Sequence, residues 1–295
     1  MLIELPAHVL ELSGPEAVSF AQAQFSSDLR ALETGQWQWS AWLSALGRVR
    51  CWFALLRVAD ERLLLWLRGD GHSALRAELA RFVFRSKVTV QVPHVSVYGA
   101  DAAGALAAGA EVPGENRLTH HDGVTALQLP DAARYVLISQ SPITQSPTTD
   151  APLDTSADAA ARARWQHDDI HAGLPQLEAA LQDQLLPQWL ALDRLGVVNV
   201  GKGCYPGQEV MARLHFKGGN KRGLYHIAFS APALPPAGTV LRTTDAEAGV
   251  IVQSAWTTGG NAEALAVFTD AAVTRVPHHV HAQPLGDIQV VSRFG

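Results

Sequence analysis

Hydrophobic and polar residues follow two different periods in the first half of the chain. Leu75, Leu79 and Phe82 recur at helical spacing, which predicts a helix over residues 71–84. Residues 87–92 alternate strictly between polar and apolar side chains, as expected of a strand with one buried face. Two further apolar runs flank residues 59–62 in the manner of a hairpin. Helices and strands in this alternation predict a mixed α+β architecture.

The second half of the chain changes character twice. Residues 140–155 are rich in Ser, Thr, Pro and Asp, which is typical of a linker. A helix that carries Trp165 is then predicted over residues 156–172, because Gly173 and Pro175 supply a stop signal. Beyond residue 223, short apolar segments alternate with Pro and Gly turns. This last pattern predicts a small all-β barrel.

The composition limits the class of protein. A chain of 295 residues exceeds the usual size of one domain, so two or three packed units are expected. With 47% hydrophobic and 17% charged residues, the chain is not of the disordered, collagen-like or coiled-coil class. No apolar run reaches the roughly 18 residues that cross a membrane, and the start lacks a secretory pattern. We therefore expect a cytoplasmic protein without membrane contact.

The most informative segment is Lys202-Gly-Cys-Tyr-Pro-Gly-Gln-Glu209, which leads into a helix-compatible stretch at 208–217. Its glycines and Pro206 predict a sharp turn at Cys204, just ahead of the positive end of that helix. A helix N-terminus and a nearby lysine both favour the thiolate, so Cys204 is predicted to be a functional thiol. The alternative is a small buried cysteine with a packing role.

The charge is unevenly distributed along the chain. In total, 23 Lys and Arg stand against 28 Asp and Glu, which gives −5. Residues 202–222 hold five Lys or Arg and one Glu, a local balance of +4, so the remainder carries −9. A basic segment on an acidic protein suits a small anionic ligand better than a long polyanion. We expect no direct nucleic-acid contact; direct tRNA binding would require this segment to form an open basic face.

The eight-residue segment resembles the K-G-C-Y-x-G-Q-E signature of the YgfZ family of folate-binding proteins, and the resemblance covers nearly the whole chain. Further matches lie at residues 20–29, 47–49, 85–90 and 172–193. The resemblance implies a fold like that of the folate-dependent aminomethyltransferases of the glycine cleavage system. Such a fold has two α+β lobes and a small C-terminal β-barrel around a central folate cavity.

The resemblance also implies a ligand, a role and a set of partners. The ligand is tetrahydrofolate or a folate derivative. The role is to support assembly or repair of iron–sulfur clusters in selected enzymes, including tRNA-modifying ones, so the expected partners are iron–sulfur proteins or assembly factors. Trp165 looks like a family tryptophan linked to folate, and an aromatic face could stack on a pterin ring. The other expected ligand contacts follow the signature: Lys202, Tyr205, Gln208, Glu209 and Arg213.

Pattern and resemblance together predict a division into lobes. Residues 1–48 with 156–223 form the folate-site lobe that carries the signature, and residues 49–140 form a ferredoxin-like α+β lobe. Residues 141–155 are the linker, and residues 224–295 form the barrel.

One difference from the aminomethyltransferases bears on activity. Those enzymes place an acidic pair shortly after the glycine that aligns with Gly47, whereas here the sequence continues Arg-Val-Arg-Cys-Trp52. The missing carboxylate favours an accessory protein that binds folate over an enzyme. The alternative is a folate-dependent one-carbon transferase that uses another acid, Asp28 or Glu209.

A pair of histidines has the spacing of metal ligands. His167 and His171 share one face of the predicted helix at positions i and i+4. The glutamate that follows the first histidine in zinc peptidases is missing, and the family resemblance implies no metal. The sequence alone therefore predicts no metal site.

Overall fold

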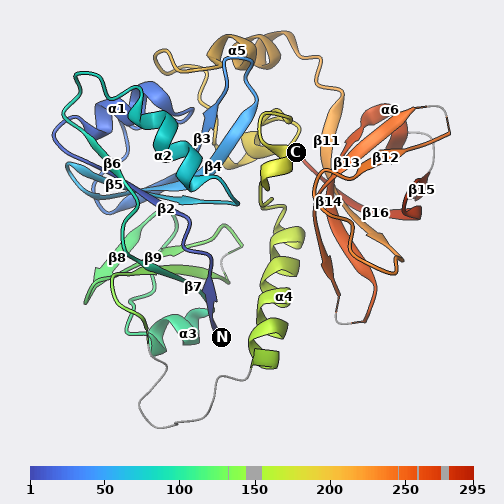
Figure 1. Ribbon diagram of the computed structural model, residues 1–295, viewed down its shortest axis with the longest axis horizontal. Coiled ribbons are helices and arrows are strands. Elements are labelled where there is room, and N and C mark those ends of the chain that lie inside the picture. Colours follow the sequence, from blue (N-terminus) through green and yellow to red (C-terminus); the bar gives the residue numbers. More distant parts are fainter. Residues whose placement is uncertain (132, 144–154, 245, 258, 274–278) are drawn as a thin grey trace.

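The computed structural model describes residues 1–131, 133–143, 155–244, 246–257, 259–273 and 279–295. Within these residues the strands form three sheets. The long helix α4 (Thr155–Ala172) lies between the first two sheets on one side and the third on the other (Figure 1). It begins one residue before the helix predicted at 156–172, while the predicted linker lies mostly outside the described residues.

The first sheet is antiparallel, with the order β3-β4-β5-β2-β6. Its strands are β2 (Val9–Ser13), β3 (Gln36–Leu43), β4 (Val49–Ala59), β5 (Arg62–Leu67) and β6 (Thr89–Gln91). Alternate residues of β4 and β5 belong to two different hydrophobic cores. Phe53 and Leu65 pack on one face of the sheet with α1 (Ala17–Gln24) and α2 (His72–Ala80). Trp52 and Trp66 lie on the other face, toward the centre of the molecule. Because both faces are buried, each strand has an unbroken apolar run, at residues 51–56 of β4 and 63–67 of β5.

The predicted helix at 71–84 is shorter in the structure. Helix α2 ends at Ala80, where the N–H of Arg81 bonds back to the carbonyls of Glu78 and Leu79. Phe82 therefore lies beyond the helix and is exposed rather than inward-facing. The predicted strand at 87–92 is confirmed as the short edge strand β6.

The second sheet has the order β1-β7-β10-β9-β8. Its strands are β1 (Leu2–Leu5), β7 (Ser96–Ala100), β8 (Leu118–His121), β9 (Val124–Gln128) and β10 (Tyr135–Ser139). Helix α3 (Ala102–Ala107) packs on β7 and β10, and the Asp101 side chain accepts a hydrogen bond from the Gly104 N–H at its start.

The two N-terminal sheets do not follow the lobes expected from the sequence. Strand β3 pairs with β4 along its whole length, across the expected boundary at residue 48. Strand β1 leaves the first 48 residues to pair with β7, in the second sheet. The lobes expected at 1–48 with 156–223 and at 49–140 are therefore not separate sheets, because the β3–β4 hairpin spans the expected boundary and β1 pairs with the distant strand β7.

The third sheet forms the C-terminal barrel, with the order β12-β13-β14-β11-β16-β15. Its strands are β11 (Arg222–Phe229), β12 (Val240–Arg242), β13 (Glu247–Trp256), β14 (Ala262–Thr269), β15 (His279–Ala282) and β16 (Gly286–Phe294). The short helix α6 (Asp270–Val273) follows β14. Arg242 and Gln283 exchange two backbone hydrogen bonds, of 3.0 and 2.9 Å, which join the two outer strands of the sheet. The barrel predicted from the β-rich tail is thereby confirmed.

Helix α4 contributes to a core shared by all three sheets. Trp165 and Ile170 pack with Trp52 of the first sheet, Val136 of the second and Leu265 of the barrel. Two 3-10 turns, Ala179–Leu181 and Leu192–Leu195, lead from α4 to helix α5 (Gln208–Lys217), whose bounds match the predicted stretch. Among the described helices, none is both long enough and apolar enough to cross a membrane.

Candidate functional site

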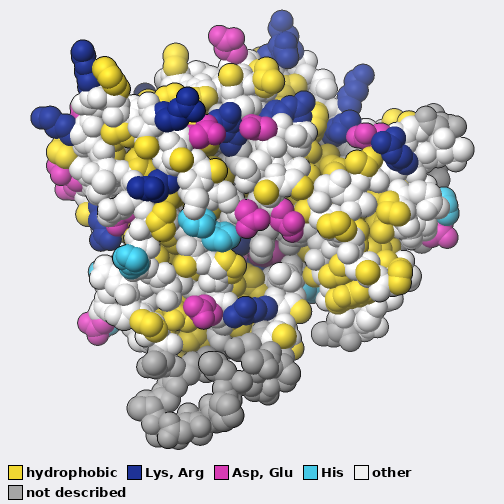
Figure 2. Space-filling model, in the orientation of Figure 1, with side chains coloured by type: hydrophobic (Ala, Val, Ile, Leu, Met, Phe, Trp, Pro, Cys, Tyr) yellow, Lys and Arg dark blue, Asp and Glu magenta, His cyan; other side chains and the backbone are white. Residues whose placement is uncertain are grey.

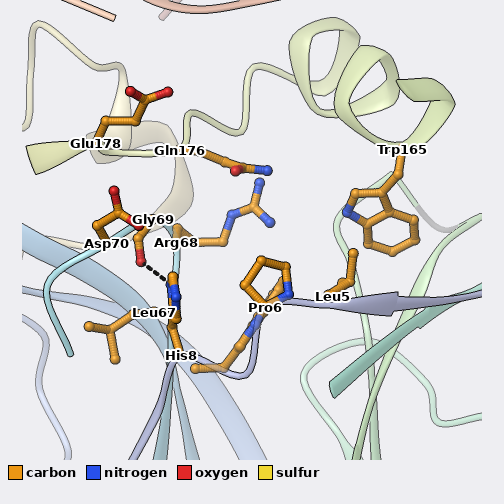
Figure 3. A pocket seen from close by; sticks show the side chains of 11 residues that line it. Leu5, Pro6, His8, Leu67, Arg68, Gly69, Asp70, Trp165, Gln176 and Glu178 are labelled. Atoms are coloured by element: carbon orange, nitrogen blue, oxygen red, sulfur yellow. Dashed lines mark hydrogen bonds between the residues drawn. The ribbon is translucent and has the colours of Figure 1, made fainter. Parts of the chain in front are cut away.

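A cavity of about 190 Å³ opens between the end of β5, the N-terminal segment and α4 (Figure 3). Trp165 stands on one side of it, while Asp70 and Glu178 lie on the opposite side. Arg68 and Gln176 lie between these two sides. The cavity thus combines an aromatic wall with a few polar groups, as small-molecule sites do.

Arg68 is a buried charge that the fold must neutralise. It follows directly on the apolar strand β5, and its side chain is 2% exposed. Its Nη2 lies 2.7 Å from Asp169 Oδ2 and donates to the Leu174 carbonyl at 3.0 Å. The guanidinium also stands over the Trp66 ring, 5.1 Å from its centre. These contacts replace the water that the cation loses on burial.

Asp169 ties three parts of the chain together. Its fully buried carboxylate accepts from Arg134 Nη1 at 2.9 Å and from Gln176 Nε2 at 3.0 Å, besides pairing with Arg68. Burial opposes the charge of Arg134, but the carboxylates of Asp169 and Asp131 outweigh it and raise the pKa of this guanidinium. The second sheet, the end of β5 and α4 therefore meet at one buried ionic cluster.

The N–H edge of the Trp165 indole faces the cavity. The indole is 1% exposed, Arg134 stands over the ring at 4.6 Å, and Gly99 packs so close that a Cβ there would lie 2.7 Å from Cζ3. In Figure 3 its nitrogen is on the side of the ring that faces Arg68. Within the described residues, Trp165 Nε1 and Arg68 Nε are buried without a hydrogen-bond partner. This arrangement suits hydrogen bonding to a ligand better than the stacking expected from the sequence.

A second cavity, of about 400 Å³, lies elsewhere along the first sheet. Trp37 and Trp39 of β3 and Arg194 line it. Both indole N–H groups of this pair are also buried without a partner among the described residues. Among the described residues, this second cavity has no buried ionic cluster like that of Arg68, Asp169 and Arg134. The first cavity is therefore the stronger candidate for a ligand site.

Lys202, the first residue of the signature, is buried. Its Nζ donates to the carbonyls of Gln22 at 2.6 Å, Phe25 at 2.5 Å and Ser27 at 2.8 Å, at and just beyond the end of α1. Burial lowers the pKa of Lys202 to about 8, so the ammonium still prevails at pH 7. All three N–H donors are engaged with these backbone carbonyls; those of Gln22 and Phe25 are acceptors left over at a helix C-terminus. The structure thus gives Lys202 an anchoring role that the sequence did not predict.

The rest of the signature packs around this anchor. The Tyr205 ring lies 5.1 Å below the ammonium, and burial raises the pKa of its phenol to about 12. Gln208 Nε2 donates to the Lys202 carbonyl at 3.1 Å. Gly207 precedes α5 with φ +82°, and a Cβ there would lie 2.6 Å from the Ser44 carbonyl oxygen. The signature loop is therefore locked against α1 and against the turn between β3 and β4.

Cys204 projects from this fixed loop into solvent. It is exposed, whereas Cys51 is buried in β4 and burial raises the pKa of the Cys51 thiol. The packing alternative therefore describes Cys51 and not Cys204. Glu209 and Arg213 of α5 are exposed as well.

The basic segment lies at the surface. Arg213, Lys217 and Lys221 are all exposed, and Figure 2 shows Lys and Arg side chains along the edge of the molecule that α5 forms in Figure 1. This is the placement that direct tRNA binding would require. The expected absence of nucleic-acid contact stays a prediction.

The structure does not bring all the predicted ligand contacts together. Trp165 lines the cavity, but no residue of the signature does. The β3–β4 turn and strand β4 connect the two places: Gly47, in the turn, packs on α5, and Trp52 of β4 lies beneath Arg68. The candidate site thus has two parts, a cavity at α4 and an exposed thiol beside α5.

The two acids considered for a transferase are not in the cavity. Asp28 pairs with Arg30 at 2.5 Å, and this hydrogen-bonded partner holds the pKa of Asp28 far below its usual range. Glu209 is exposed on α5. The carboxylates that do line the cavity are Asp70 and Glu178.

Sequence reasoning missed the polar residues of the cavity, although two signals were present. Arg68 is a charge placed directly after an apolar strand, and Asp169 follows Trp165 by one helical turn. Either pattern indicates a buried charge that requires a partner.

Comparison with known proteins identifies the chain's relatives. It is 32% identical over 237 residues to the tRNA-modifying protein YgfZ of Cronobacter sakazakii, which covers 77% of this chain and 70% of the relative. With the tRNA-modifying protein YgfZ of Escherichia fergusonii it shares 32% identity over 234 residues, 77% of this chain and 71% of the other. No family model matches the chain.

The fold has a solved counterpart. The glycine cleavage system aminomethyltransferase T of Bartonella henselae superposes with a TM-score of 0.70 at 18% identity, covering 99% of this chain and 84% of the other. The predicted α+β, aminomethyltransferase-like fold is thereby confirmed. With the signature, the architecture and the relatives in agreement, the chain belongs to the YgfZ family.

Proposed function

We propose that this protein is a folate-binding accessory factor that supports assembly or repair of iron–sulfur clusters in selected enzymes, tRNA-modifying ones included. Tetrahydrofolate, or a derivative, would occupy the cavity beside Trp165. The observation that carries the proposal is the pair of buried, unpartnered donors in this cavity, Trp165 Nε1 and Arg68 Nε.

The polar groups of the cavity fit a pterin ring. A pterin presents a carbonyl oxygen and ring nitrogens as acceptors along part of its edge, and amino and amide N–H donors along another part. The cavity has the Trp165 donor on one side, the Arg68 donor in the middle and the carboxylates of Asp70 and Glu178 on the opposite side. Each side can thus satisfy one set of pterin groups, which is how a few polar residues orient a ligand.

The exposed thiol supports the accessory role. Cys204 lies at the surface on a loop that Lys202 and Gly207 hold in place. The adjoining β3–β4 turn exposes the apolar side chain of Leu46. An accessible thiol next to an apolar contact point suits a transient encounter with a partner protein. The iron–sulfur cluster belongs to that partner and is the cargo of the encounter.

Replacing Trp165 by phenylalanine should weaken tetrahydrofolate binding about five- to tenfold. The substitution keeps the aromatic packing but removes the N–H donor, and a hydrogen bond contributes about 1 kcal/mol. Isothermal titration calorimetry with the purified full chain measures the affinity. The matched control is Trp39→Phe, which removes the same kind of unpartnered donor from the second cavity. Weaker binding in the control, with Trp165→Phe unchanged, would move the folate site to that second cavity.

Replacing Cys204 by alanine should abolish support of iron–sulfur enzymes while leaving the fold intact. An exposed side chain contributes less than about 0.5 kcal/mol to stability. The readout is the fraction of tRNA modified by an iron–sulfur-dependent enzyme, in cells whose only copy of this protein is the variant. As a control, Cys51→Ala removes the buried thiol, and cells should keep their modified tRNA. Full modification with Cys204→Ala would refute the role of this thiol.

A further inference from the structure

Helix α4 turns a second functional face toward the barrel. Trp165 and Asp169 of α4 lie in the central core and the ionic cluster, whereas His167 and His171 meet two barrel residues, His226 of β11 and Glu263 of β14. Glu263 Oε2 lies 3.0 Å from His167 Nε2, 3.0 Å from His171 Nε2 and 2.9 Å from His226 Nε2. Three imidazoles therefore converge on one carboxylate oxygen.

Hydrogen bonding alone satisfies this cluster poorly. His167 Nε2 and His171 Nε2 are 3.2 Å apart, and both face Glu263 Oε2. If both nitrogens carry a hydrogen, both N–H groups point at Glu263 Oε2, which His226 Nε2 also approaches at 2.9 Å, so three donors crowd one oxygen. If one nitrogen presents its lone pair instead, that lone pair faces a carboxylate oxygen that is itself an acceptor. A cation bound by His167, His171 and Glu263 removes the conflict, because each of these three groups can then direct a lone pair at it.

The spacing of the ligand atoms of His167, His171 and Glu263 suits a small transition-metal ion. Zn²⁺ binds imidazole nitrogen and carboxylate oxygen at about 2.0–2.2 Å in tetrahedral sites, so neighbouring ligand atoms lie about 3.3–3.5 Å apart. The three separations among His167 Nε2, His171 Nε2 and Glu263 Oε2 are 3.0, 3.0 and 3.2 Å, a few tenths of an ångström shorter. Imidazole ligands favour Zn²⁺ and its neighbours in the d block over Mg²⁺ and Ca²⁺, which take oxygen ligands.

We propose that His167, His171 and Glu263 form a binding site for a divalent transition-metal ion, zinc in the first place, which ties α4 to the barrel, while His226 holds Glu263 in position. The site is open to solvent on one side and fixed to the barrel on the other. The side chain of His171 is 52% exposed, which gives an ion a way in, whereas that of His226 is 4% exposed and fixes the inner side of the site.

The ligand set is split between two parts of the chain. The sequence alone predicts no metal at His167 and His171, because the carboxylate that completes the site stands 92 residues after His171. The barrel brings it close by pairing β11 with β14, which sets Glu263 opposite Ala228 and His226 opposite Leu265.

Metal titrations of the full, untagged chain test the site. After treatment with a chelator, Zn²⁺ is added and binding is followed by calorimetry, and Co²⁺ is added to obtain the visible spectrum of a four-coordinate ion. We expect one ion per chain and a higher midpoint of thermal unfolding with Zn²⁺. The double variant His167→Ala/His171→Ala should weaken Zn²⁺ binding by at least about tenfold and abolish the four-coordinate Co²⁺ spectrum.

Two further variants separate ligation from folding. Glu263→Gln keeps the size of the side chain but removes its charge, so it should lower the affinity in a chain that still folds. The control His281→Ala removes an exposed barrel histidine that pairs with Asp287, and its Zn²⁺ affinity should equal that of the unmodified chain. Absence of one-to-one Zn²⁺ binding, or equal affinity in the double variant, overturns the proposal. Tighter binding of Fe²⁺ than of Zn²⁺ under anaerobic conditions overturns the choice of zinc.

Discussion

Replacing Asp169 by alanine is expected to lower the free energy of unfolding by about 3–5 kcal/mol, because it leaves two buried guanidinium groups without their shared carboxylate. Arg68 and Arg134 are 2% and 4% exposed, so water cannot take the place of Asp169 without opening the core. Urea denaturation of the purified full chain, followed by circular dichroism, measures the change. A loss of this size is large compared with the stability of most domains, so the variant should also accumulate less in cells.

The adjacent residue offers a matched control. Asp168 has the same side chain on the same helix but is partly exposed, and it makes no ion pair within the described residues. Asp168→Ala should change the free energy of unfolding by less than about 0.5 kcal/mol. Equal effects of the two substitutions would show that charge on α4, rather than the buried cluster, sets the stability.

Replacing Lys202 by alanine should lower the free energy of unfolding by about 2–4 kcal/mol. The substitution leaves the carbonyls of Gln22, Phe25 and Ser27 without their donor in a site that is nearly closed to water. The same urea titration measures this effect. We expect the folded fraction to bind tetrahydrofolate with unchanged affinity, because Lys202 lies outside the cavity and its donors are engaged with the backbone.

The control for this prediction is Lys217→Ala, which removes an exposed lysine from the last turn of α5 at a cost of about 0.5 kcal/mol or less. If Lys202→Ala instead kept full stability and lost folate affinity, the lysine would be a ligand contact, as the sequence first suggests. The pair of measurements therefore separates anchoring from ligand binding.

The sequence predicted well those features that depend on neighbouring residues. The glycines and proline of the signature placed the start of α5 correctly, and the stop signals at Gly173 and Pro175 placed the end of α4. Spacing of turns in the tail predicted the barrel. Each of these signals acts within a few residues, through backbone conformation or a short hydrophobic period.

Features that depend on distant pairing could not be predicted in the same way. Nothing in the first residues of the chain shows that β1 leaves its neighbours to join β7, more than 90 residues later. Likewise, a lysine in a basic segment indicates an anion site, whereas burial against three carbonyls turned Lys202 inward. Whether such a charge is buried or exposed depends on the folded structure, because a buried charge requires partners that the order of residues in the sequence does not reveal.

The reciprocal bonds between Arg242 and Gln283 have a consequence for how copies of this chain meet. A free sheet edge presents unpaired N–H and C=O groups on which another chain can add a strand. In the barrel these bonds occupy backbone groups where the two outer strands, β12 and β15, approach each other. Templated strand addition between molecules is thereby discouraged at this point of the barrel, where the backbone groups of Arg242 and Gln283 already have partners.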